Sequence, residues 1–139
     1  MEKFLEIKYL KIKYKTLDEE KTVLDIEHLE IEKGTTFGLV GESGAGKTVL
    51  AQTILGLLPT PPGVIESGEI WMDGENLLTK SMKEMETLRG SKMAMIFQDP
   101  LSCLNPVFTV KQQMMNVVNA HKKVSKAEAE KLISDMVRK

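Results

Sequence analysis

One octapeptide constrains the fold of this 139-residue chain more than any other stretch. Residues 41–48 read Gly-Glu-Ser-Gly-Ala-Gly-Lys-Thr, which matches the pattern G-x-x-x-x-G-K-[ST]. Glycines at these spacings let the backbone curl so that successive N–H groups point inward, where a Cβ atom would be in the way. A following helix adds its unpaired N–H groups and the positive end of its dipole. The octapeptide therefore predicts a phosphate-binding P-loop.

The residues on both sides of the octapeptide support this interpretation. Residues 35–40 are typical of a buried strand and residues 47–58 of a helix, so strand, loop and helix follow in the required order. The alternative is a glycine-rich turn that merely caps a helix. We expect Lys47 to reach the β- and γ-phosphates and the Thr48 hydroxyl to bind Mg²⁺. The predicted phosphate site comprises Gly41, Ser43, Gly44, Ala45, Gly46, Lys47 and Thr48.

Composition is that of an ordinary globular domain, with 42% hydrophobic and 28% charged residues. The net charge of −1, from 19 basic and 20 acidic residues, argues against a general nucleic-acid or membrane-surface binder. The single cysteine, Cys103, allows no internal disulfide and fits a reducing compartment. Neither a signal-peptide core nor a run of roughly 18 apolar residues is present, so we expect a cytoplasmic protein.

The remaining patterns predict an α/β organisation around the loop. Residues 4–15 and 22–32 alternate apolar and charged side chains, as antiparallel strands do, and 67–74 reads as a strand ending in an Asp-Gly turn. Residues 82–88 predict a short helix, and the apolar run 93–97 a buried parallel strand. We therefore divide the chain into an antiparallel β region (1–34 and 66–74), the P-loop strand and helix (35–58), a second parallel strand (92–98) and a helical region (99–139).

The helical region contains two predicted helices after a loop at 101–110. The first carries Met114, Val117 and Val118 on one face. The second begins at the capping box of Ser125 and Glu128. Its apolar stripe consists of Ala129, Leu132, Ile133, Met136 and Val137, and it needs a surface to cover.

Two further residues are candidates for the site. Tyr14 is either an ordinary strand aromatic or a platform on which a base stacks. Gln98 follows a predicted parallel strand, whose carboxyl end faces the ligand crevice of an open α/β sheet, so it could meet Mg²⁺ or a water; an ordinary loop glutamine is the alternative. His28 and His121 each lack a second ligand at metal spacing, and we assign them no chemistry.

Three segments together resemble the ATP-binding subunit of an ABC transporter. They are the octapeptide 41–48, Met-Ile-Phe-Gln-Asp-Pro at 95–100 and Leu-Asn-Pro-Val-Phe-Thr-Val at 104–110. Glu42-Ser43, Arg89-Gly90 and the Leu-Asn-Pro string resemble those of dipeptide, oligopeptide and nickel importers in particular. The resemblance extends along essentially the whole chain. It implies a P-loop NTPase core of the α/β class, with an antiparallel β subdomain and the start of a helical subdomain.

The resemblance also implies roles for individual residues. Tyr14 would stack on adenine, residues 43–48 would cradle the phosphates, and Gln98 would be the Q-loop glutamine that senses Mg²⁺ or the attacking water. ATP and Mg²⁺ would be the cofactors. The partners would be transmembrane permease subunits, contacted through 99–139, and a second nucleotide-binding subunit, all at the inner face of the cell membrane.

The sequence departs from the family pattern after Gln98. The family continues to a Leu-Ser-Gly-Gly-Gln signature, a Walker B strand ending in Asp-Glu and a switch histidine, and no Leu-Ser-Gly-Gly string occurs here. We therefore expect the N-terminal half of a nucleotide-binding domain, inactive in hydrolysis by itself and self-associating through unpaired strand edges.

Two other functions remain open. One is a non-transport P-loop protein, such as a nucleotide kinase or a DNA-handling ATPase; the arginine-rich lid of the former and the zinc or coiled-coil insertion of the latter are not visible in the sequence. The other is a half-domain that only binds nucleotide or takes part in assembly. The transported substrate is not encoded in these residues.

Overall fold

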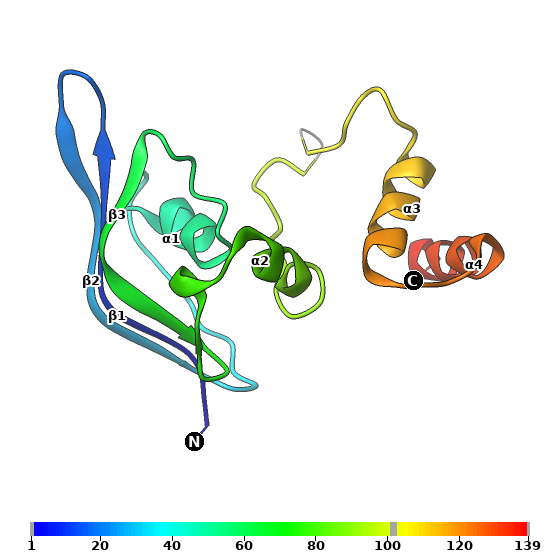
Figure 1. The fold of residues 1–139 in the computed structure, drawn as a ribbon, viewed down its shortest axis with the longest axis horizontal. Coiled ribbons are helices and arrows are strands. Elements are labelled where there is room, and N and C mark those ends of the chain that lie inside the picture. The colour runs from blue at the N-terminus through cyan, green and yellow to red at the C-terminus, as the bar shows by residue number, and fades with distance from the viewer. Residues whose placement is uncertain (1, 101–102, 139) are drawn as a thin grey trace. The chain divides into compact units, whose positions relative to one another are not determined.

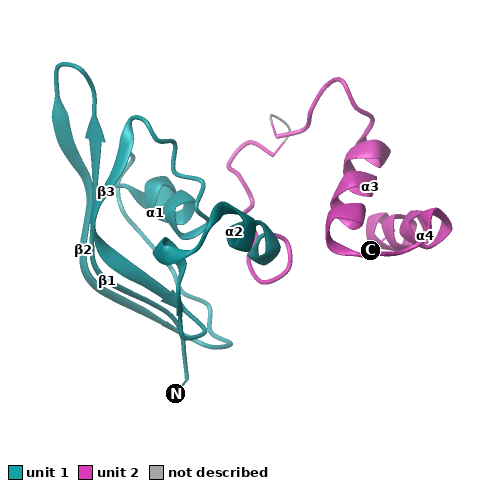
Figure 2. Ribbon diagram, in the orientation of Figure 1, with its two compact units in different colours: residues 1–89 teal, residues 90–139 magenta. Residues whose placement is uncertain are grey.

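The computed structural model describes residues 2–100 and 103–138 and divides into two compact units, Met1–Arg89 and Gly90–Lys139 (Figure 2). The first unit contains a β-sheet and short helices. The second contains two helices, α3 (Val110–His121) and α4 (Lys126–Val137). Within the described residues, no helix is long and apolar enough to cross a membrane.

A four-stranded sheet with the order β2-β1-β3-β4 organises the first unit (Figure 1). Its strands are β1 (Lys3–Lys15), β2 (Glu20–Glu32), β3 (Gly63–Met72) and β4 (Glu75–Asn76), and every neighbouring pair is antiparallel. The two-residue turn Asp73-Gly74 joins β3 to β4, with φ of 48° and 81°, the left-handed values that a tight hairpin requires. The antiparallel region expected around the P-loop is therefore present, although β3 begins earlier than the predicted residue 67.

One face of this sheet forms the hydrophobic core. The helices α1 (Lys47–Ile54) and α2 (Met82–Leu88) and the 3₁₀ turn η1 (Leu77–Thr79) supply apolar side chains to the core, and Figure 1 shows α1 lying alongside the sheet. Burial of this apolar surface is the main driving force for folding of the unit. The buried apolar residues of the first unit are Leu5, Ile7, Leu10, Ile12, Leu50, Leu55, Ile70, Met72, Leu77 and Met85.

A β-bulge on β1 keeps its apolar residues on the core face. Lys8 pairs with Glu69 and Lys11 pairs with Ser67, so Tyr9 and Leu10 together lie opposite the single residue Gly68. Tyr9 has a φ of 50°, and the extra residue shifts the alternation of the strand by one. This is why the buried positions change from odd numbers before the bulge to even numbers after it.

The outer face of the sheet carries a network of ion pairs. Lys3 Nζ lies 3.0 Å from Glu6 Oε1 and 2.8 Å from Glu30 Oε2, and Lys8 Nζ lies 3.1 Å from Glu6 Oε2. Hydrogen bonds from Lys3, Lys8 and His28, in that order of effect, lower the pKa of Glu6 to about 2. The alternating lysine and glutamate residues of β1 and β2 thus form a solvated face whose charges are paired.

The two predicted parallel strands are not formed, and this part of the sequence-based expectation is wrong for the described structure. Residues 35–40 have no regular secondary structure, and Val40 is 93% exposed. In 93–97, Met93 makes only an isolated bridge, and Ile96 is 93% exposed. A buried parallel strand needs hydrogen-bonded neighbours and cover on both faces. The described residues provide neither for these two segments.

The second unit is a helical hairpin in which α3 and α4 pack on each other. The predicted capping box of Ser125 and Glu128 is confirmed, with Glu128 N–H donating to Ser125 Oγ at 3.3 Å. A second box, Thr109 with Gln112, begins α3 and was not predicted. Of the predicted apolar stripe only Ala129 is fully buried. Residues 101 and 102 of the loop predicted at 101–110 lie outside the described residues.

The β-bulge gives a test of the fold. A Cβ added at Gly68, whose φ is 114°, would lie 2.8 Å from the Tyr9 carbonyl oxygen and would also meet the Leu10 backbone. Gly74 is the matched control, because its φ of 81° carries a similar left-handed cost but a Cβ there meets nothing within 4 Å. We expect Gly74→Ala to lower the free energy of unfolding by about 1–2 kcal/mol, and Gly68→Ala to lower it by clearly more. Urea unfolding of both variants measures this, and equal losses would contradict the bulge geometry.

Candidate phosphate-binding site

The loop 41–46 is positioned by a close approach to β2. Gly46 is the N-cap of α1 and adopts a left-handed conformation, with φ of 81°. A Cβ on Gly46 would lie 2.7 Å from the Val23 carbonyl oxygen and 2.9 Å from Leu24 Cδ1. Only glycine satisfies both constraints, the left-handed backbone and the lack of room. The last glycine of the motif therefore fixes the start of α1 against the sheet.

The loop is open to solvent at Gly44. Gly44 also has a left-handed φ of 83°, but a Cβ there would meet nothing within 4 Å, so the space beside it is free. Gly46 has no side chain to cap the helix, and the first helical bond, from Leu50 N–H to the Gly46 carbonyl, is 2.8 Å long. The N–H groups of the first turn are thus available to an external acceptor. These features fit a bound phosphate group.

Lys47 folds back over the loop that precedes it. Its Nζ donates hydrogen bonds to the carbonyl oxygens of Gly41 and Glu42, each 2.6 Å long. The backbone N–H of Ala45 donates to the same Glu42 oxygen at 3.2 Å and closes the turn. Within residues 2–100 and 103–138, no carboxylate is ion-paired with Lys47. The ammonium is held at the cradle by neutral carbonyls, which leaves its positive charge for an anion.

Thr48 occupies the second position of α1, where its side chain is exposed at the mouth of the loop. A hydroxyl is a hard oxygen ligand of the kind that Mg²⁺ accepts beside phosphate oxygens. Ser43, Gly44 and Ala45 are exposed as well. The predicted residues 41–48 therefore come together at one solvent-accessible site.

Tyr14 lies on β1 close to the place where the loop meets the sheet. Ile12 pairs with Leu24, the residue that Gly46 approaches, and Tyr14 pairs with Lys21 on β2 and Gly63 on β3. Because side chains alternate along a strand, Tyr14 shares the helix-bearing face with Ile12. It is only half-buried. The register thus places Tyr14 two residues along β1 from Ile12, whose partner Leu24 is the residue that Gly46 approaches.

Gln98, the second candidate outside the loop, is described only within its own unit. It belongs to the second unit, and its position relative to the phosphate loop is not defined. It is exposed at a bend, because the parallel strand that would end there is not formed. The geometry predicted for Gln98, a polar group at the carboxyl end of a strand, is therefore absent from the described structure.

A second cluster has ligand chemistry but is already neutralised. Glu6, His28 and Glu30 place ligand atoms within 4.8 Å of one another on the outer face of the sheet. The Lys3 ammonium lies between the two carboxylates and takes the place of a cation. Sequence spacing missed this cluster because Glu6 lies on β1, whereas His28 and Glu30 lie on β2. The cluster becomes recognisable once the register of β1 and β2 is known, because Glu6 then pairs with Glu30 and Lys8 with His28.

Comparisons with known proteins agree with the loop geometry. Residues 24–139 match the family described as ABC transporter. The oligopeptide transport ATP-binding protein OppD of Bacillus subtilis (strain 168) is 43% identical over 129 residues, which cover 93% of this chain and 36% of that protein. The dipeptide transport ATP-binding protein DppD of the same organism is 39% identical over 137 residues, or 99% of this chain and 41% of that protein.

A further relative is the oligopeptide transport ATP-binding protein OppD of Salmonella typhimurium, 38% identical over 125 residues, which cover 90% of this chain and 37% of that protein. The chain thus spans between 36% and 41% of the length of these three relatives. The family match covers well over half of the chain and includes the phosphate loop. This chain therefore belongs to the ABC transporter family.

Proposed function

We propose that this chain binds ATP with Mg²⁺ through residues 41–48 and serves as the ATP-binding part of a peptide importer. The observation that carries the proposal is the phosphate loop, with left-handed backbone at Gly44 and Gly46, free space beside Gly44, and a lysine held by two carbonyl oxygens of the loop. The import function is supported by the relatives, which are named as oligopeptide and dipeptide transport ATP-binding proteins.

Backbone and side-chain groups of residues 43–48 have separate roles in binding the phosphates and Mg²⁺. The backbone N–H groups of 43–48 donate to phosphate oxygens, aided by the helix dipole. Lys47 Nζ exchanges its two carbonyl bonds for charge-assisted bonds to phosphate, which are stronger. The Thr48 hydroxyl ligates Mg²⁺. The bound nucleotide supplies the phosphoanhydride bond whose hydrolysis powers transport in the whole protein.

Tyr14 and Gln98 complete the proposed site. Tyr14 stacks on the base; the support is that its side chain is only half-buried and that it lies two residues along β1 from Ile12, the strand partner of Leu24. Gln98 senses Mg²⁺ or the attacking water once a parallel strand forms beneath it. This role rests on the family resemblance, and it requires the segment 93–97 to gain strand neighbours.

We further propose membrane partners for the second unit. Transmembrane permease subunits would contact 99–139, and a second nucleotide-binding subunit would complete the assembly at the cytoplasmic face of the cell membrane. The support is a set of exposed apolar side chains on and before α3, of the kind that marks interaction surfaces. They are Val107, Phe108, Val110 and Val117.

The first functional prediction concerns Lys47. Charged hydrogen bonds contribute about 1.5–3 kcal/mol each, so Lys47→Ala should weaken Mg-ATP binding by roughly 10- to 100-fold or more. Lys83→Ala is the control, since Lys83 is an exposed lysine of α2 in the first unit and is not part of the loop. Isothermal titration with Mg-ATP and a thermal melt of each variant provide the measurement. Unchanged affinity in Lys47→Ala would refute the site.

The second functional prediction concerns base stacking. Stacking on an aromatic ring is worth roughly 1–3 kcal/mol and tolerates any base, so Tyr14→Ala should weaken ATP and GTP alike. Tyr14→Phe keeps the ring and should retain the affinity for both. Titration of a fluorescent nucleotide, with ATP and GTP as competitors, compares the three proteins. Equal nucleotide affinities in all three proteins would contradict base stacking and would indicate that Tyr14 only packs within the sheet.

A third prediction concerns self-association of the 139-residue chain. Val40 and Ile96 are each 93% exposed and Val107 is 82% exposed, and all three lie in segments without regular pairing. Apolar segments of this kind bind other chains. Static light scattering at increasing protein concentration should show a rising mean mass. A constant monomer mass up to the highest soluble concentration would contradict the predicted self-association.

A further inference from the structure

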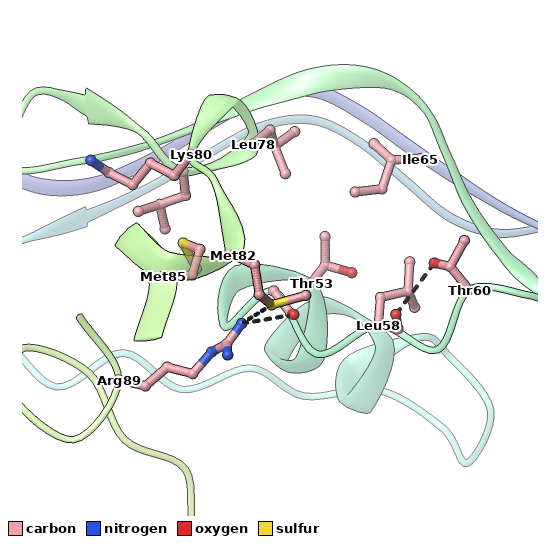
Figure 3. A pocket seen from close by; sticks show the side chains of 11 residues that line it. Thr53, Leu58, Thr60, Ile65, Leu78, Lys80, Met82, Met85 and Arg89 are labelled. Carbon is pink, nitrogen blue, oxygen red and sulfur yellow. Dashed lines mark hydrogen bonds between the residues drawn. The ribbon is translucent and has the colours of Figure 1, made fainter. Parts of the chain in front are cut away.

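Arg89 ties together the ends of two helices. Its backbone N–H donates to the Met85 carbonyl at 3.0 Å, which ends α2. Its side chain reaches 34 residues back along the chain, where Nε donates to the Leu55 carbonyl at 2.7 Å and Nη2 donates to the Gly56 carbonyl at 3.0 Å. Figure 3 shows the guanidinium pointing at this end of α1. One residue thus joins the C-terminal ends of α1 and α2.

The end of α1 is shaped to receive a cation. Gly56 has a φ of 62°, its N–H donates to Thr53 O at 3.0 Å, and Leu57 N–H donates to Gln52 O at 2.7 Å, the pattern of a Schellman cap. The last turn of α1 contains no basic residue of its own. The carbonyls of Leu55 and Gly56 carry the negative end of the helix dipole, and Arg89 supplies the opposite charge.

Gly56 also makes room for the guanidinium. A Cβ at that position would lie 3.0 Å from Arg89 Nη2 and 3.2 Å from Met85 Cε. Beside this contact lies an open cavity of about 400 Å³, lined in part by Thr53, Leu77 and Met82. Figure 3 shows this cavity with Thr53 and Met82 at its wall. Apolar packing between α1 and α2 is therefore incomplete here. The two hydrogen bonds from Arg89 are the specific link between the two helices at this end.

We propose that Arg89 is a positioning residue for phosphate binding. An eight-residue helix is a rod about 12 Å long, so an end that is held in place also sets the direction of the other end. The other end of α1 carries Lys47 and the N–H groups of the phosphate loop. Gly46 fixes the position at which the N-terminal end of α1 meets β2. Arg89 holds the C-terminal end of α1 and thereby fixes the direction of the helix axis. The inference rests on the proposed nucleotide binding but assigns a separate residue to it.

The test compares three variants of the 139-residue chain. Arg89→Met keeps an unbranched apolar stem but loses both carbonyl bonds, whereas Arg89→Lys keeps the charge without the planar fork. Leu77→Ala is the control, because it removes a buried side chain from the same cavity and leaves Arg89 intact. Two quantities are measured at a temperature where each variant is folded: the Kd for Mg-ATP, and amide hydrogen exchange across 44–57 without nucleotide.

We expect Arg89→Met to raise the Kd about tenfold, because small misplacements of binding groups are costly, and Arg89→Lys to raise it less. Exchange should quicken at both ends of α1 in the nucleotide-free Arg89→Met protein. Leu77→Ala should lower the melting temperature and leave the Kd within about twofold.

Two results would overturn the proposal: an unchanged Kd and unchanged exchange at the loop in Arg89→Met, or an equal loss of affinity in Leu77→Ala. If Arg89→Met does not fold, Arg89→Lys decides by the same two measurements. Should the unsubstituted chain bind no Mg-ATP, the proposed function itself fails. Exchange at residues 44–50 without nucleotide then still decides whether Arg89 orders the loop.

Discussion

The close approach of Gly46 to β2 is the constraint on which the rest of the site depends. The backbone of Gly46 is left-handed and has no room for a Cβ beside Val23 and Leu24. This contact ties the start of α1 to the sheet, and the sheet is held in turn by the buried side chains of β1 and β3. An antiparallel β region thus provides the support on which a phosphate loop is presented. The family sequence pattern and the local geometry agree at this point.

The parts of the structure that local sequence patterns predict correctly are those whose causes are local. The capping box at Ser125 and the Asp73-Gly74 hairpin turn each depend on residues only a few positions apart. The β-bulge at Tyr9 was not predicted, because it arises from Gly68, nearly sixty residues later, and appears only when the two strands are paired. Local alternation therefore predicts the strands, but it does not predict which residues of β1 face the core on either side of the bulge.

The two predicted strands that the structure does not contain, at 35–40 and 93–97, have a common physical explanation. The segments 35–40 and 93–97 have the apolar composition of buried strands, yet both lack regular pairing among the described residues. A buried parallel strand depends on neighbours that are distant in sequence, so composition alone does not determine whether it forms. The strand predicted to end at Gln98 is not formed for the same reason, and the role of Gln98 stays a prediction. The sequence of Arg89-Gly90 indicates the family, but it does not predict the hydrogen bonds of Arg89. These join Arg89 to Leu55 and Gly56, which are more than thirty residues away, and they depend on the fold.

The most direct test of the account is whether the backbone of the loop binds phosphate. Amide chemical shifts of residues 43–48 would be followed by NMR as Mg-ATP, Mg-pyrophosphate or adenosine is added to the chain. We expect saturable shifts at these amides with both phosphate compounds, and little change there with adenosine. Shifts confined to other regions, or equal responses to adenosine and pyrophosphate, would contradict the assignment of residues 41–48 as a phosphate site.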